Sequence, residues 1–246
     1  MEPLAVRPSL HLIPFPVGQA YLWRDGGTLT LVDTGPPGGA DGVEDAIRRS
    51  GGDPRALRRI VLTHFHPDHA GSAAELAARH DAEVIAHAAD APVLRGEAPA
   101  EPPDLATAPE WERTVFDQVH APFGITSAAP AVPPTPPCRV DREVSEGDVI
   151  EIGTGARVLS VPGHTRGSIA LLLTRERTLF TGDAVAGARG GPVPGVFNQD
   201  RARTLDSFLR LCAVGAEAAE TVCFGHGEPL TCSDGETLRQ AAAQYS

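Results

Sequence analysis

Three histidines and an aspartate occupy four of six consecutive positions in the stretch HFHPDH, residues 64–69. The stretch follows IVLT, residues 60–63, an apolar and β-branched run that predicts a strand. His64 and His66 are two positions apart, so an extended chain directs both imidazoles to the same side. The proline then turns the chain and brings the aspartate and the third histidine to the start of a helix. Since imidazole and carboxylate are the side chains that bind zinc, the pattern predicts a metal site.

Three more residues of the same chemistry each follow a short apolar run further along the chain. His164 lies in VPGHTRGS, Asp183 ends LFTGD and His226 lies in CFGHGEP. One such residue alone is weak evidence, because an aspartate after a strand often caps a helix. Their shared position past a strand end indicates that loops gather them at one edge of a rigid scaffold. His87 follows a strand but is a weaker candidate, and His120 has no ligand-type neighbour, which favours a surface or core position.

Strands and helices must position these loops. Both halves of the chain run strands first and helices after, which predicts a sheet-on-sheet core with helices outside, built from two similar halves. Strands are predicted at residues 10–15, 20–23, 28–33, 60–63, 83–87, 138–144, 148–152, 157–161, 168–173, 178–180 and 221–224. Helices are predicted at residues 40–50, 72–80, 110–120, near 201–214 and near 234–244. At the second of these helices, Ser72 and Glu75 predict a capping box.

The stretch from about residue 95 to residue 137 has a different character, because it contains ten prolines. This proline content excludes a central strand or a long helix, and only the predicted helix at residues 110–120 interrupts it. The stretch is therefore either a linker or a lid over a site. Prolines lower the entropy cost of holding one loop shape, which favours a lid.

Apolar residues in and beyond this stretch could contact a substrate. Trp111, Val115 and Val119 are spaced by four, so one face of the helix can pack inward. A lid would present apolar groups of this kind to an apolar substrate. The loop at residues 186–200 follows Asp183 and could line the same opening. The candidate substrate contacts are Trp111, Phe116, Phe123, Phe197 and Asn198.

The composition argues against several classes of protein. The net charge is −11 and all 21 basic residues are arginine, so the surface would repel nucleic acid and anionic membranes. No apolar run approaches the ~20 residues of a membrane span, and no basic leader of a signal peptide is visible. The four cysteines form no CxxC pair, which argues against a disulfide framework. We predict a cytoplasmic protein with reduced thiols and a small-molecule substrate, and the oligomeric state stays open.

Five motifs occur in a fixed order between residues 31 and 229: LVDTG, HFHPDHAG, PGHTRGS, FTGDA and FGHGEP. In type and order they resemble the motifs of the metallo-β-lactamase superfamily, whose signature is HxHxDH. The resemblance spans nearly the whole chain. It implies an α/β fold, the αββα sandwich of two mixed β-sheets with helices on the outer faces, with a two-metal site between the inner sheets. Residues 1–246 would form a single domain of this kind.

The resemblance also implies which side chains hold the metals. Seven residues would bind two ions, three for each ion and one shared: His64, His66 and His164 for the first, Asp68, His69 and His226 for the second, and Asp183 as the bridge. Asp33 in LVDTG would not be a ligand but would hold a ligand loop by hydrogen bonds. This donor set suits two divalent ions, Zn²⁺ above all, although Fe or Mn can occupy such sites.

The chemistry of such a site is hydrolysis. Two metals that share a water lower its pKa from 15.7 to about 7, so that a bridging hydroxide becomes the nucleophile. One metal polarises the substrate carbonyl, and Asp68 can orient the hydroxide and take its proton. We therefore predict a dinuclear hydrolase that cleaves a small ester, lactone or thioester.

Departures from the family pattern narrow the subfamily. Asp183 stands where one major group of true lactamases has cysteine, and only twenty residues follow His226, which leaves no room for the helical substrate domain of glyoxalase II. Two alternatives stay open. One is a mononuclear iron oxidoreductase of the sulfur-dioxygenase kind, which shares the motif but leaves the second metal site empty. The other is a metal-dependent thioesterase or cyclase of secondary metabolism.

Overall fold

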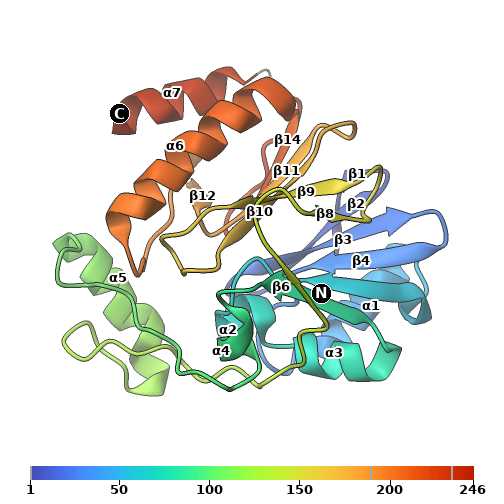
Figure 1. Cartoon of the computed structure of the whole chain (residues 1–246), viewed down its shortest axis with the longest axis horizontal. Coiled ribbons are helices and arrows are strands. Elements are labelled where there is room, and N and C mark those ends of the chain that lie inside the picture. The colour runs from blue at the N-terminus through green and yellow to red at the C-terminus, as the bar shows by residue number, and fades with distance from the viewer. Residues whose placement is uncertain (1, 189, 234) are drawn as a thin grey trace.

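The computed structural model describes residues 2–188, 190–233 and 235–246. Two β-sheets lie face to face, and helices cover the outer face of each sheet (Figure 1). The sequence-based prediction of an αββα sandwich is therefore confirmed.

The first sheet is mixed. Within the described ranges its strands are, in spatial order, β1 (Leu4–Arg7), β2 (Leu10–Pro14), β3 (Gln19–Asp25), β4 (Thr28–Val32), β5 (Leu57–Val61), β6 (Glu83–His87) and β7 (Arg142–Val144). Neighbours from β1 to β4 run antiparallel, and neighbours from β4 to β7 run parallel. The carboxyl ends of β4, β5 and β6 therefore meet at one edge of the sheet.

The second sheet faces the first. Its strands, in spatial order, are β14 (Thr221–Phe224), β11 (Thr178–Gly182), β10 (Ile169–Leu173), β9 (Ala156–Ser160) and β8 (Val149–Ile150). Only the pairing of β11 with β14 is parallel among these described strands. A separate hairpin of β12 (Val185–Ala188) and β13 (Gly191–Pro194) follows β11 and was not predicted from the sequence.

Helices pack on the outer faces. The described α-helices are α1 (Ala40–Arg49), α2 (Pro67–Ala70), α3 (Ala73–His80), α4 (Ala91–Leu94), α5 (Glu110–His120), α6 (Arg201–Ala218) and α7 (Glu236–Tyr245). In Figure 1, α1 and α3 lie against the first sheet, and α6 and α7 lie against the second. The helix α6 extends four residues beyond its predicted end. Gly215 lies in this extension and lets α7 pack closely on α6, because a side-chain carbon there would lie 2.8 Å from Leu238 of α7.

Alternation along the strands builds the core between the sheets. Leu31 points to the α1 and α3 side of its sheet, whereas Val32 points into the space between the sheets. In the second sheet, Leu171 faces inward and Leu172 packs toward α6 and α7. Successive side chains of a strand point to opposite faces, so both faces of each sheet need apolar residues in a four-layer fold.

Two local expectations are corrected. The strand β5 ends at Val61, two residues before its predicted end, because the backbone N–H of Thr63 donates to Asp33 Oδ1 at 2.8 Å. The capping box at α3 does not form. The hydroxyl of Ser72 instead donates to the carbonyl oxygen of Pro36 at 2.6 Å, and it accepts from the backbone N–H of Gly39 at 2.9 Å.

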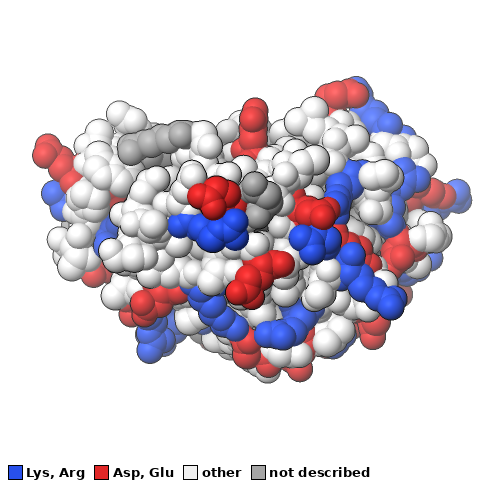
Figure 2. Space-filling view, turned by 90° about the horizontal axis from the view of Figure 1, so that it is seen from above, with Lys and Arg blue, Asp and Glu red and all other residues white. Residues whose placement is uncertain are grey.

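The surface carries both signs of charge. On the face seen in Figure 2, acidic and basic side chains lie next to each other rather than in separate fields. The part of the chain that the structure describes holds no helix with the length and apolarity needed to span a lipid bilayer.

Candidate metal centre

The loop after β5 carries the first candidate ligands. The chain stays extended at His66, which precedes the short helix α2, and Pro67 occupies the first position of that helix. Proline suits this position because its missing N–H would have no helical partner there and its fixed φ fits the helix. The loop therefore directs His64 and His66 to one side, and α2 carries Asp68 and His69 to the same place.

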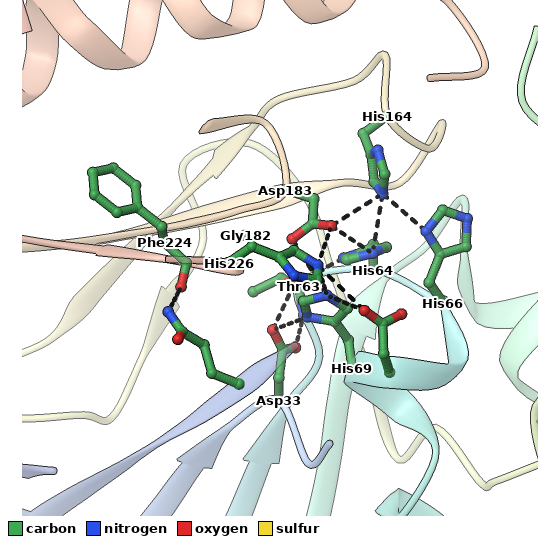
Figure 3. A network of polar contacts seen from close by, with 12 residues as sticks. Asp33, Thr63, His64, His66, His69, His164, Gly182, Asp183, Phe224 and His226 are labelled. Atoms are coloured by element: carbon green, nitrogen blue, oxygen red, sulfur yellow. Dashed lines mark hydrogen bonds and ion pairs between the residues drawn. The ribbon is translucent and has the colours of Figure 1, made fainter. Parts of the chain in front are cut away.

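All seven expected ligands lie together (Figure 3). They form three overlapping groups, in which the ligand atoms of each group lie within 4.8 Å of one another: His64, His66 and His164; His64, His69 and Asp183; and Asp68, His69 and His226. These residues are called the metal centre below. The first and third groups contain the residues expected for the two ions, and Asp183 lies between them.

Distances between opposing atoms support this arrangement. Nε2 of His164 lies 2.8 Å from Nδ1 of His66 and 3.2 Å from Nε2 of His64. On the other side, Nε2 of His226 lies 3.1 Å from Asp183 Oδ2 and 3.2 Å from Asp68 Oδ2. Asp183 thus contacts the third group directly, and its Oδ2 is also 3.6 Å from His164 Nε2 of the first group.

Outer hydrogen bonds fix the imidazole tautomers. The Nδ1–H of His69 donates to Asp33 Oδ2 at 2.9 Å, and that of His164 donates to the carbonyl oxygen of Val196 at 3.0 Å. Thr63 donates its hydroxyl hydrogen to Asp33, so its oxygen accepts from His64 Nδ1 at 3.0 Å. When neutral, each ring presents its Nε2 lone pair inward, as a metal ligand requires.

These inward atoms have the chemistry of a metal site. With the Nδ1–H groups of His64 and His164 donating outward, their Nε2 lone pairs face each other at 3.2 Å and cannot hydrogen-bond to each other, so a shared cation is the partner that would satisfy them. Asp183 Oδ1 is buried without a hydrogen bond. Gly225 lies so close that an added side-chain carbon would be 1.8 Å from that oxygen. The residues therefore fit divalent metal ions.

The electrostatics differ between the two halves of the centre. Burial lowers the pKa of His66 to about 3, and burial also holds the pKa of His64 well below its usual value. The carboxylate of Asp183 raises the pKa of His226 to about 10. Burial would raise the pKa of Asp183 itself, but His226 and His69 hold it well below its usual range. The histidines of the first group are thus neutral, as ligands must be, and a metal bound by the third group would displace protons.

Asp33 makes the hydrogen bonds expected of a bracing residue. Its carboxylate is 3% exposed and accepts from the backbone N–H and the hydroxyl of Thr63 as well as from His69. It thereby ties the loop after β5 to α2. Its backbone adopts φ of +61°, which is uncommon for a residue other than glycine.

Sequence reasoning missed Asp90. This carboxylate is 1% exposed and accepts from the Thr165 hydroxyl and from the Gly167 backbone N–H, both at 2.7 Å. It therefore braces the loop that carries His164. Burial raises the pKa of Asp90 to about 6. The sequence offers no signal for this role, because an aspartate just before Ala-Pro is typical of the start of a helix.

A cavity of about 550 Å³ opens beside the metal centre. Five residues of the centre line it, and apolar residues make up most of the remaining lining. From the insertion and the later loop, the larger side chains that line it include Phe116, Val119, His120, Phe123 and Phe197. These five residues are called the wall below. The expectation that Phe116, Phe123 and Phe197 lie near the cleft agrees with this geometry.

Two expected substrate contacts lie elsewhere. Trp111 is 53% exposed and does not line the cavity, because Glu112 and Phe116 occupy the buried face of α5. The expected inward face of Trp111 and Val115 is therefore wrong. Asn198 also does not line the cavity: it is 2% exposed, and its side-chain amide donates to the carbonyl oxygen of Gly195 at 2.8 Å.

Two histidines outside the motifs differ in position. His120 stacks on Phe116 with ring centroids 4.0 Å apart and lines the cavity, a place that the sequence did not indicate. His87 belongs to none of the three ligand groups, and its Nε2 lies 3.3 Å from the hydroxyl of Ser160.

Known proteins share this sequence pattern and fold. The probable metallo-hydrolase YflN of Bacillus subtilis is 27% identical over 220 residues, which cover 83% of this chain and 77% of that protein. A hydroxyacylglutathione hydrolase of Cereibacter sphaeroides is 29% identical over 210 residues, which cover 84% of this chain and 61% of that protein. The crystal structure of a metallo-beta-lactamase family protein from Thermus thermophilus has a TM-score of 0.64 and 26% identity, over 98% of this chain and 79% of that one. Residues 13–226 match the sequence profile of the metallo-beta-lactamase superfamily, and the chain therefore belongs to that superfamily.

Proposed function

We propose that this protein is a dinuclear metal-dependent hydrolase that cleaves a small ester, lactone or thioester in the cavity beside the metal centre. The observation that carries the proposal is the pair of ligand groups that meet at Asp183 and open onto that cavity. When bound, two divalent ions, Zn²⁺ above all, would lower the pKa of a shared water and polarise the substrate carbonyl.

The residues of the chain supply position and proton transfer. Asp68 lines the cavity, and its side chain is 23% exposed, so it can accept the proton of the attacking water at Oδ2. The water oxygen attacks the carbonyl carbon, the bond to the alcohol or thiol breaks, and the proton passes from Asp68 to that leaving group. Asp33 and Val196 hold the imidazoles of His69 and His164 in place during the reaction.

The mononuclear iron oxidoreductase is the weaker alternative. It would leave the third ligand group without a role, yet the ligand atoms of Asp68, His69 and His226 lie within 4.8 Å of one another. His69 is also fully buried and is held by Asp33, as a metal ligand would be.

The insertion at residues 95–137 is proposed as a lid within the same domain. Its support is the position of α5, which lies beside the start of α6 in Figure 1 and contributes side chains to the wall. All four cysteines are free, and burial raises the pKa of Cys138 to about 11. This agrees with the proposal of a cytoplasmic protein with reduced thiols.

Metal analysis tests the proposal. Protein purified without added metal, then titrated with Zn²⁺ and analysed by mass spectrometry, should bind two ions per chain and hydrolyse p-nitrophenyl esters. One iron and no zinc per chain, with no hydrolysis after zinc loading, would instead support the oxidoreductase.

A further inference from the structure

Exposed apolar side chains gather at the mouth of the cavity. Val17, Val119 and Phe123 line it and are 48%, 41% and 60% exposed. These three residues, of which Val119 and Phe123 also belong to the wall, are called the rim. A folded protein seldom leaves large apolar side chains in water side by side unless the surface binds something apolar. The rim therefore indicates an apolar group on the ligand that enters here.

Away from the metal centre, the described lining of the cavity offers no arginine or lysine side chain to a negatively charged ligand. None of the described residues that line it is an arginine, and the sequence contains no lysine. The carboxylates in the lining are Asp68 and Asp183, and of the lining histidines only His120 lies outside the metal centre.

Arginines of the surrounding segments are engaged elsewhere. Arg166 pairs with Glu101 at 2.9 Å, and Arg113 donates to the carbonyl oxygen of Ala108. Arg201 pairs with Glu112, a carboxylate that is 0% exposed. Recruiting Arg201 to a ligand would leave that buried carboxylate unpaired, which is unfavourable.

The wall is held in place before any ligand binds. Glu112 accepts from the backbone N–H of Phe197 at 2.7 Å, which fixes the later loop against α5. The backbone N–H of Asp104 donates to the carbonyl oxygen of Asn198 at 2.8 Å, a second link between the same segments. The rings of Phe116 and Phe197 then meet edge to face, with centroids 5.2 Å apart. A preformed apolar wall binds an apolar group at low entropy cost.

From the apolar rim, the fixed wall and the lack of an arginine or lysine in the described lining, we propose that the substrate is an uncharged compound with an apolar acyl group. It is an ester, a lactone or a thioester of a neutral thiol, and not a thioester of an anionic carrier such as glutathione or coenzyme A. The inference rests on the proposed hydrolase function and names the substrate class of the same site. The charges of an anionic carrier would lie along the apolar wall and rim, beyond the metal centre, where no guanidinium group of the described lining replaces the water that those charges lose.

Three thioesters with one acyl group test the inference directly. S-octanoyl-N-acetylcysteamine, S-octanoylglutathione and octanoyl-coenzyme A share the bond that breaks and differ in the charge of the carrier. The zinc-loaded protein should hydrolyse the neutral thioester with a kcat/KM at least about tenfold higher than either anionic one. Among p-nitrophenyl esters, kcat/KM should rise by up to about fourfold for each added methylene that enters the cavity.

Ligand binding separates the inference from the proposed function. Isothermal titration calorimetry of the zinc-loaded protein should detect N-hexylbenzamide, which is neutral, and not S-hexylglutathione at the same concentrations. Tighter binding or faster hydrolysis of the glutathione and coenzyme A compounds would overturn the inference and leave the hydrolase intact. Two bound metals without hydrolysis of any ester or thioester would overturn the hydrolase, and the inference with it.

A charge introduced at the rim provides the matched variant. Phe123→Arg should raise the kcat/KM for octanoyl-coenzyme A relative to the neutral thioester by about tenfold, because it supplies the missing cation. Trp111→Arg adds the same charge to the same insertion but outside the cavity, so the ratio should stay at the wild-type value. An equal change in both variants would mean that overall charge, and not the rim, sets the preference, which would contradict the inference.

Discussion

The metal centre and the wall border one cavity but are held in different ways. At the metal centre, buried carboxylates hold the ligand loops: Asp33 binds His69 and Thr63, and Asp90 binds the loop of His164. The wall depends on aromatic contacts and on one ion pair that joins α5 to α6.

We expect the metal centre to govern the reaction and the wall to govern substrate preference. The residues at the metal centre fix the atoms that any hydrolysis would need, and they are polar and closely spaced. Under the proposed function, the residues of the wall would contact the rest of the substrate. Changes at the metal centre should therefore reduce metal content and turnover together, whereas changes in the wall should alter substrate preference and leave the metals in place.

The largest effect is expected for Asp183→Ala. The variant loses the carboxylate that lies between both ligand groups, so both metals should be lost together and kcat should fall by about a thousandfold. Metal analysis and ester hydrolysis measure the two effects. Two retained metals with near-normal turnover would show that Asp183 does not bridge them.

A pH-dependent change in stability is expected for Asp90. Its folded pKa is raised to about 6 from an ordinary 3.8, so its contribution to stability is fully present below pH 3.8 and is lost as the pH rises through about 6. The loss amounts to about 3 kcal/mol. Asp90→Asn removes this titration. Urea unfolding should therefore show the stability of the wild type, relative to the variant, falling by this amount between about pH 4 and pH 7, and a constant difference would contradict the assignment.

A smaller loss is expected at the brace of His69. Asp33→Asn keeps the size of the side chain but removes the charge that accepts from His69 Nδ1, so metal affinity should fall by about 10- to 100-fold. Competition with a chelator measures this affinity. His87→Ala is the control, because His87 lies outside the ligand groups, and loss of metal in that variant would require a different ligand set.

Glu112→Gln tests the ion pair with Arg201 that holds the wall in place. The variant weakens the pairing with Arg201, so the kcat/KM for p-nitrophenyl hexanoate should fall by about tenfold while metal content stays unchanged. The expected loss is smaller than that for breaking a fully buried ion pair, because the Arg201 side chain is 38% exposed and solvent screens its charge. Glu110→Gln removes the same charge from an exposed site of α5 and should have little effect. An equal loss in both variants would show that the ion pair of Glu112 with Arg201 has no special role.

The smallest effect is expected at the rim. Phe123→Ala should raise KM for the hexanoate ester by about threefold, since the ring is only partly buried. Trp111→Ala should leave KM unchanged, because Trp111 does not line the cavity. A larger change for Trp111 than for Phe123 would mean that α5 presents its other face to substrate.

The fold could be predicted because its signals are local. Short apolar runs with turns between them predicted most of the strands of both sheets. The ends of elements were less accurate. At β5 and α3, Asp33 and Ser72 form hydrogen bonds with residues distant in sequence, and these bonds replaced the expected strand end and capping box.

By itself the sequence determined the composition and order of the metal centre, because its ligands are crowded into one short motif or placed directly after strands. Only the tertiary structure decided which face of α5 meets the cavity. Both faces carry apolar residues, and the buried one also holds Glu112, which a hydrophobic pattern would place in water. Its partner Arg201 lies 89 positions away. A buried charge is tolerated only where such a partner exists, and no local pattern reveals a contact at that separation.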